Sequence, residues 1–233
     1  MKKIIDKADS RGGFDHGWLK TKHTFSFSQY YNPERIHFGT LRVINDDKIA
    51  PSEGFDLHPH QDMEIVTIPL KGYVRHGDSL DNSQVITRGE IQVMSAGTGI
   101  YHLEYNGSET QELELLQIWI FPREKDLAPR YNSYQITDLL KKNDISLFLS
   151  PNSEASIAQD AWLSWANLDK SVSKEYKLYG QNTGVYIFIV EGLVKIGDDI
   201  LSRRDGIGVT EVDKIDITAL EDSEIIFFEV AMQ

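Results

Sequence analysis

Gly54-Phe55-Asp56-Leu57-His58-Pro59-His60 carries two histidines two positions apart, with a proline between them. In an extended strand, residues i and i+2 point to the same face, close enough to share one ion. Proline fixes its own φ and biases the preceding residue towards extended geometry, so strand spacing is expected here. His102-Leu103-Glu104 has the same spacing. Two such strands predict a four-ligand metal site made by His58, His60, His102 and Glu104.

Either half of this pattern is weak by itself. An isolated His-Pro-His is more often part of a surface loop, and a lone His-x-Glu carries less information still. The two occur together here, bounded by glycines at positions 54, 72, 89 and 99, and this joint occurrence favours a metal site. Imidazole and carboxylate suit iron, zinc, nickel, manganese, copper or cobalt, and the ligand types do not choose among them. We expect a single divalent ion, and among these metals we expect iron before the others.

The rest of the chain has the rhythm of an all-β protein. Short β-branched and aromatic runs alternate with Gly, Asn and Asp turns at 64–70, 73–76, 83–86, 91–94 and 113–121. A second set with the same order lies at 185–190, 193–196, 200–201, 207–209 and 225–230. This pattern predicts a sandwich or barrel fold with a degenerate internal duplication. The join falls near 122–134, and a short helical connection capped by Thr137 is expected at 136–142.

Composition narrows the classes of function. The chain has 233 residues and a formal net charge of -12, which disfavours direct binding of nucleic acid. There is no cysteine, so disulfides, thiolate ligands and cysteine nucleophiles are excluded. The apolar runs have the length of strands and the N-terminus has no secretory pattern, so we expect a cytoplasmic monomer without a membrane segment. All seven histidines lie at or before position 102, so the second half cannot hold a three-histidine site.

The chain resembles the pirin family, whose members contain two cupin barrels. Residues 54–72 resemble the first cupin motif and residues 89–106 the second. The more specific likeness is carried by His16-Gly17-Trp18-Leu19, His23-Thr24-Phe25-Ser26-Phe27, Tyr30-Tyr31-Asn32-Pro33, Arg42-Val43-Ile44-Asn45-Asp46-Asp47, His58-Pro59-His60-Gln61-Asp62-Met63-Glu64 and Met94-Ser95-Ala96-Gly97-Thr98-Gly99-Ile100. The match to specific residues extends to about residue 131. Beyond it, only the pattern of strands and turns is similar.

The resemblance implies two cupin barrels of jelly-roll type with few short helices. Residues 1–131 form the metal-binding barrel and 132–233 a degenerate barrel without metal. The implied ligands are again His58, His60, His102 and Glu104. In many other cupins the carboxylate ligand belongs to the first motif, which leaves Glu64 as an alternative ligand or a residue beside the site.

The resemblance also implies an activity. It is that of a quercetin 2,3-dioxygenase, which opens a flavonol-like ring with O₂, and Glu104 is our hypothesis for the catalytic base. The small-molecule partners are then an aromatic, flavonol-like substrate and O₂. The alternative is a non-catalytic, metal-binding regulator that acts through a protein partner.

Three further groups have open roles. His76-Gly77-Asp78 fits either a support for the metal ligands or a solvated turn. His16 and His23 are expected to form hydrogen bonds in the core. The aromatic residues between Trp18 and Tyr31 are expected to pack there rather than stack on a ligand.

Overall fold

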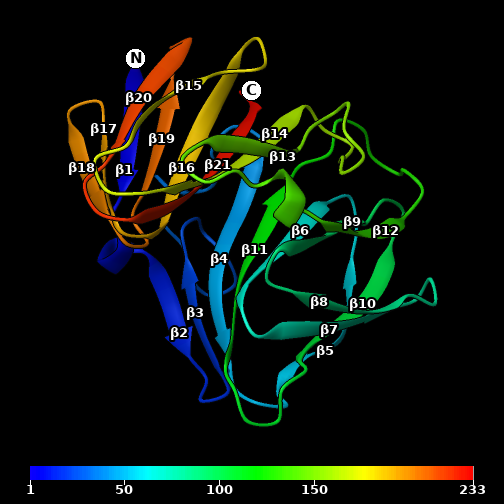
Figure 1. Cartoon of the computed structure of the whole chain (residues 1–233). Coiled ribbons are helices and arrows are strands. Elements are labelled where there is room, and N and C mark those ends of the chain that lie inside the picture. The colour runs from blue at the N-terminus through cyan, green and yellow to red at the C-terminus, as the bar shows by residue number, and fades with distance from the viewer. Residues whose placement is uncertain (233) are drawn as a thin grey trace.

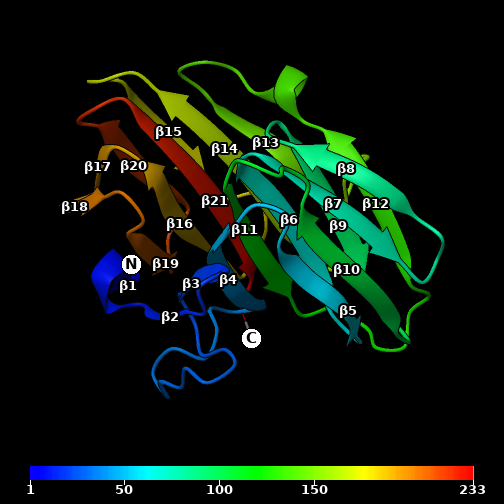
Figure 2. The same ribbon diagram turned by 90° about the horizontal axis from the view of Figure 1, so that it is seen from below.

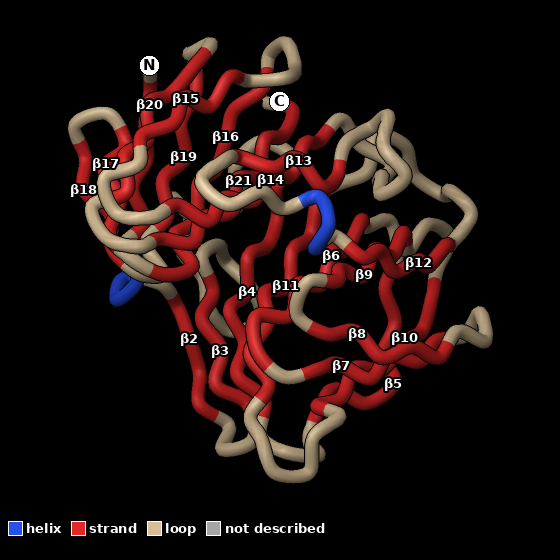
Figure 3. The backbone as a smooth tube through the Cα atoms, in the orientation of Figure 1, coloured by secondary structure: helices blue, strands red, loops and turns tan. Residues whose placement is uncertain are grey.

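The structure, a computed structural model, describes residues 1–232, and its regular secondary structure is almost all strand (Figures 1 and 3). The first barrel contains β2 (Gly12–Asp15), β3 (Leu19–His23), β4 (Leu41–Ile49), β5 (Gly54–His60), β6 (Glu64–Lys71), β7 (Tyr73–Asp78), β8 (Ser83–Thr87), β9 (Glu90–Ser95), β10 (Ile100–Asn106), β11 (Leu113–Ile120) and β12 (Arg130–Gln135). The second contains β1 (Lys2–Asp6), β13 (Ile145–Leu149), β14 (Ala161–Leu168), β15 (Ser173–Lys177), β16 (Thr183–Glu191), β17 (Leu193–Ile196), β18 (Asp199–Ser202), β19 (Gly206–Thr210), β20 (Lys214–Ala219) and β21 (Ser223–Ala231). The predicted all-β, two-barrel fold is confirmed.

Both barrels are built from one large and one small sheet with the same strand order. In the first barrel, the large sheet contains β9-β6-β11-β4 and the small sheet is β5-β10-β7-β8. In the second, the corresponding strands are β19-β16-β21-β14 and β15-β20-β17-β18. The turns after β6 and β16 both use a glycine with positive φ, Gly72 at 78° and Gly192 at 96°. This repetition supports the internal duplication that the sequence suggested.

The two large sheets pack against each other and share one core (Figure 2). Ile44, Ile68 and Ile118 of the first barrel belong to the same buried cluster as Phe188 and Phe228 of the second. Strands β6 and β16 are therefore covered on both faces, which explains why they appear in the sequence as continuous apolar runs.

The chain passes from one barrel to the other twice, once between β1 and β2 and once after β12. The N-terminal strand β1 pairs with β19 and lies among the strands of the second barrel (Figure 1). The predicted division at residue 131 falls within β12, which pairs with β9 of the first barrel as far as Gln135.

Among residues 1–232, helical structure is confined to two single turns of 3-10 helix, η1 (Ala8–Ser10) and η2 (Thr137–Leu139). The helical connection expected at 136–142 is thus shorter than predicted. Thr137 does not cap it, since its hydroxyl donates to Gln135 Oε1 at 2.9 Å. Within residues 1–232, no helix has both the length and the apolar character that crossing a membrane requires.

Candidate metal centre

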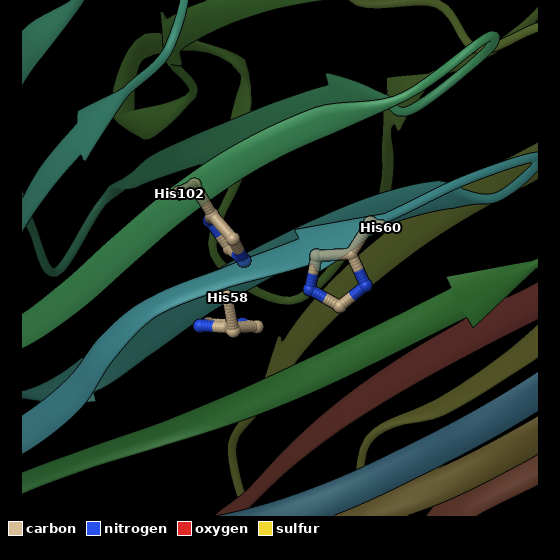
Figure 4. Close-up of side chains that lie close together, drawn as sticks. All are labelled: His58, His60 and His102. Atoms are coloured by element: carbon tan, nitrogen blue, oxygen red, sulfur yellow. The ribbon is translucent and has the colours of Figure 1, made fainter.

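Strands β5 and β10 bring three of the predicted ligands together. The strands are antiparallel neighbours, and His102 lies directly opposite His58. The ring centroids are 4.4 Å apart for His58 and His102, and 4.8 Å apart both for His58 and His60 and for His60 and His102. The three rings converge on one point of the barrel interior (Figure 4). Their ligand nitrogens lie within 4.8 Å of one another.

Burial keeps two of these imidazoles, those of His60 and His102, neutral, as a metal ligand must be. Burial, and then the nearby His102 and His58, lowers the pKa of His60 to about 3. Burial, followed by His58 and His76, lowers the pKa of His102 to about 3 as well. His102 is 1% exposed, and neither of its ring nitrogens has a hydrogen-bond partner. Unpaired buried nitrogens are costly unless something binds them, so the site fits a cation.

His58 is oriented by its own strand. Its Nδ1 lies 2.7 Å from the carbonyl oxygen of Asp56, which can only accept a hydrogen bond. Nδ1 therefore carries the proton, and Nε2 keeps its lone pair free. Metal-binding histidines are typically fixed in this way by an acceptor behind the ring.

Glu104 lies on the same strand but deeper in the barrel. Its Oε1 accepts hydrogen bonds from Thr67 Oγ1 at 3.0 Å and from Gln92 Nε2, and its Oε2 accepts one from Gln117 Nε2 at 2.7 Å. Its carboxylate forms a possible ligand group with His102 and His76, rather than with His58 and His60. The structure thus joins the four predicted ligands through His102 without placing all four in one group.

The three donors to Glu104 were not singled out from the sequence. Thr67 is the register partner of both Gln92 and Gln117, so the three side chains form a row across β9, β6 and β11. Each is a polar residue inside a strongly apolar run, and that was the signal available in the sequence.

Glu64, the alternative ligand, lies elsewhere. Its Oε2 accepts hydrogen bonds from Ser95 Oγ at 2.6 Å and from the Ala158 backbone amide at 3.1 Å. It belongs to neither of the potential ligand groups found among residues 1–232. Glu64 therefore ties β6 to β9 and to the segment before β14.

His76 and Asp78, on β7, form a pair inside the barrel. His76 Nε2 and Asp78 Oδ2 are 2.9 Å apart, and the His76 ring stacks on Tyr131 with centroids 4.0 Å apart. His76 is 2% exposed, which excludes a solvated turn. Of the other two histidines considered, His23 is buried and bonded to Asn45 Oδ1 at 2.7 Å, while His16 is exposed.

Comparisons with known proteins agree with this architecture. Residues 5–120 match the family described as Pirin, and residues 147–230 match the Quercetinase C-terminal cupin domain. A protein of Escherichia coli K12 named quercetin 2,3-dioxygenase is 42% identical over 97% of both chains. A pirin-like protein of Caulobacter vibrioides is 40% identical over 98% of this chain and 100% of its own.

The solved structures include a bacterial pirin, YhhW of Escherichia coli, in complex with nickel(II). It is 40% identical, covers 100% of both chains and superposes with a TM-score of 0.94. The identity and coverage extend through both barrels and include the strands that carry the histidines.

Proposed function

Because this chain belongs to the pirin family, we propose that it is a metal-dependent dioxygenase of the quercetin 2,3-dioxygenase type. The observation that carries the proposal is the convergence of three half-buried or buried histidines on one point. His58, His60 and His102 would hold one divalent transition-metal ion, with Glu104 as the fourth ligand. The relatives named as quercetin 2,3-dioxygenases support a flavonol-like substrate and O₂.

An ion held by these residues would supply a Lewis acid, which would make an enolic hydroxyl of the substrate more acidic. Glu104 then accepts the hydroxyl proton. Thr67, Gln92 and Gln117 donate to the Glu104 carboxylate and hold it in place. Trp119 lies edge-on to His60, with ring centroids 4.9 Å apart, and is half-buried. It provides an apolar wall beside the histidines on the side that solvent reaches.

The test is to measure bound metal by elemental mass spectrometry and quercetin consumption under O₂. The wild-type chain should bind about one equivalent of metal and consume quercetin, and His58→Ala should lose turnover. Glu104→Gln should keep much of the metal but lose turnover by about a hundredfold or more. His16→Ala, an exposed histidine away from the site, is the matched control. Turnover retained in Glu104→Gln would remove Glu104 as the base, and metal without turnover in the wild type would reject the dioxygenase proposal.

A second candidate, a metal-binding regulator that acts through a protein partner, is favoured by the outer face of the same sheet. Leu57 on β5 and Tyr101 on β10 are 61% and 52% exposed. They lie on the strands that carry the histidines. If regulation is the function, a Leu57→Ser/Tyr101→Ser variant should bind metal normally but no longer bind the protein partner. Neither the wild-type chain nor this variant should then consume quercetin.

Three narrower expectations stay predictions: iron as the native ion, a monomeric state, and a cytoplasmic location. Elemental analysis of the chain purified without added metal tests the first, and light scattering in solution tests the second.

A further inference from the structure

His76 has the hydrogen-bonding pattern of a metal ligand although it lies outside the His58, His60 and His102 group. Asp78, which faces its Nε2, also accepts hydrogen bonds from the backbone amides of Leu80 at 2.8 Å and Asn82 at 3.1 Å, and from the Asn82 side chain. So many donors favour the ionised carboxylate, which can only accept. His76 therefore donates from Nε2, and its Nδ1 has a free lone pair.

That lone pair has no hydrogen-bond partner among the residues that the structure describes, 1–232. His76 Nδ1 is buried and unbonded. The stack of the imidazole on Tyr131, with an interplanar angle of 9°, fixes the plane of the ring. A carboxylate behind a histidine whose other nitrogen is free is the usual support of a metal-binding imidazole.

Two other ligand atoms lie in front of His76. Strand pairing places His76 directly opposite Glu104, and Asp78 opposite His102. One ligand atom from each of His76, His102 and Glu104 lies within 4.8 Å of the others, and all three residues are buried. Both nitrogens of His102 are free, so His102 can serve this group as well as the group formed with His58 and His60.

We propose that His76, His102 and Glu104 form a second position for a divalent transition-metal ion, deeper in the barrel than the position at His58, His60 and His102. The inference rests on the proposed metal-binding function. Two imidazoles and one carboxylate are suitable ligands for such an ion. Because His102 and Glu104 would serve both positions, the barrel holds one ion at a time, in either position. An ion in the deeper position is enclosed by buried side chains and is kept away from the half-buried face where a substrate would bind.

The experiment removes the outer position and asks whether the inner one still binds. Purified His58→Ala/His60→Ala chain is dialysed against cobalt(II) without O₂, and bound cobalt and its visible absorption are measured. Both substituted residues are half-buried on the edge strand β5, so the core is left intact, and circular dichroism checks the fold. About one equivalent of cobalt should remain bound. Adding His76→Gln should weaken this binding by about tenfold or more, whereas adding His16→Gln, the matched control, should not.

A folded double variant that binds no cobalt, or one whose binding is unaffected by His76→Gln, overturns the second position. If the double variant does not fold, the wild-type chain gives the answer. Its cobalt spectrum should contain two ligand environments, of which His76→Gln removes one, and an unchanged spectrum overturns the inference. These readouts use metal alone, so they are independent of whether the wild-type chain consumes quercetin.

Discussion

The carboxylate of Glu104 is held by more donors than a metal ligand or a base requires. With two bonds on Oε1 and one on Oε2, little of the accepting capacity of this carboxylate is left. Gln92 is itself oriented, because its Oε1 accepts a hydrogen bond from Tyr131 at 3.2 Å. Tyr131 in turn stacks on His76. The position of one carboxylate thus depends on side chains from several strands.

Asp47 is a second buried carboxyl group in the first barrel, and it gives a pH-dependent prediction. Burial, opposed in part by Thr21 and reinforced by Asp46 and Glu104, raises the pKa of Asp47 to about 7. A folded-state pKa above the unfolded one means that ionisation destabilises the fold increasingly as pH rises from about 4 to 7. Asp47→Asn removes that charge. Its gain in the free energy of unfolding should be larger at pH 8 than at pH 5 by on the order of 2 kcal/mol.

Urea denaturation of the metal-free wild type and variant at both pH values measures this difference. Asp15→Asn, at an exposed carboxylate, is the control and should show no such dependence. An equal effect of Asp47→Asn at the two pH values would mean that Asp47 does not titrate between them.

At the scale of the elements, the site depends on how closely β5 approaches β10. A β-carbon at Gly54 would lie 2.3 Å from the Glu104 carbonyl oxygen and 2.5 Å from Tyr105 Cα. Both are backbone atoms and cannot move aside cheaply, so Gly54→Ala must push β5 away from β10 and displace His58 and His60 from His102. We expect metal affinity to fall by about tenfold or more while the chain still folds.

Metal titration of purified Gly54→Ala measures the effect, with Gly197→Ala as control. Gly197, unlike Gly54, has a positive φ, at 57°, and a β-carbon there meets no atom within 4 Å. That variant should lose about 1 kcal/mol of stability and keep its metal affinity. An unchanged metal affinity in Gly54→Ala would show that β5 accommodates the β-carbon without displacing the histidines.

The same strands show what the sequence could and could not predict. Alternation along a strand is local, so the common face of His58 and His60, and that of His102 and Glu104, could be predicted. Which strand lies beside which is not local. The opposition of His76 and Glu104, and the row of Thr67, Gln92 and Gln117, depend on pairing between β7, β10, β6, β9 and β11. The five residues of β1 gave no signal that they complete the other barrel.

At the scale of the whole molecule, the two barrels differ in the side chains that fill their interiors. Strands β15 and β20 correspond to β5 and β10, but they place Tyr176, Ile215 and Ile217 in a continuous buried apolar cluster. The second barrel instead contributes apolar side chains to the core that it shares with the first barrel.

Charges reinforce that shared core. Asp46 of β4 is buried between Arg11 and Arg204, with N–O distances of 3.0 Å and 3.3 Å. Arg204 lies between β18 and β19 of the second barrel. Separating the barrels would expose the shared apolar cluster and leave Asp46 without the Arg204 partner. Either barrel alone would therefore expose apolar side chains of the shared core and lose an ion pair.

The barrels should therefore unfold together, in a single urea transition of the metal-free chain. Trp18 and Trp119 report on the first barrel, and Trp162 and Trp165 on the second. In a Trp162→Phe/Trp165→Phe variant, and in a Trp18→Phe/Trp119→Phe variant, the fluorescence midpoint should coincide with the midpoint from circular dichroism, because partial unfolding would expose the common core. A first-barrel signal that changes at lower urea than the circular dichroism would mean that the metal-binding barrel opens independently, and that the shared core does not couple the two halves.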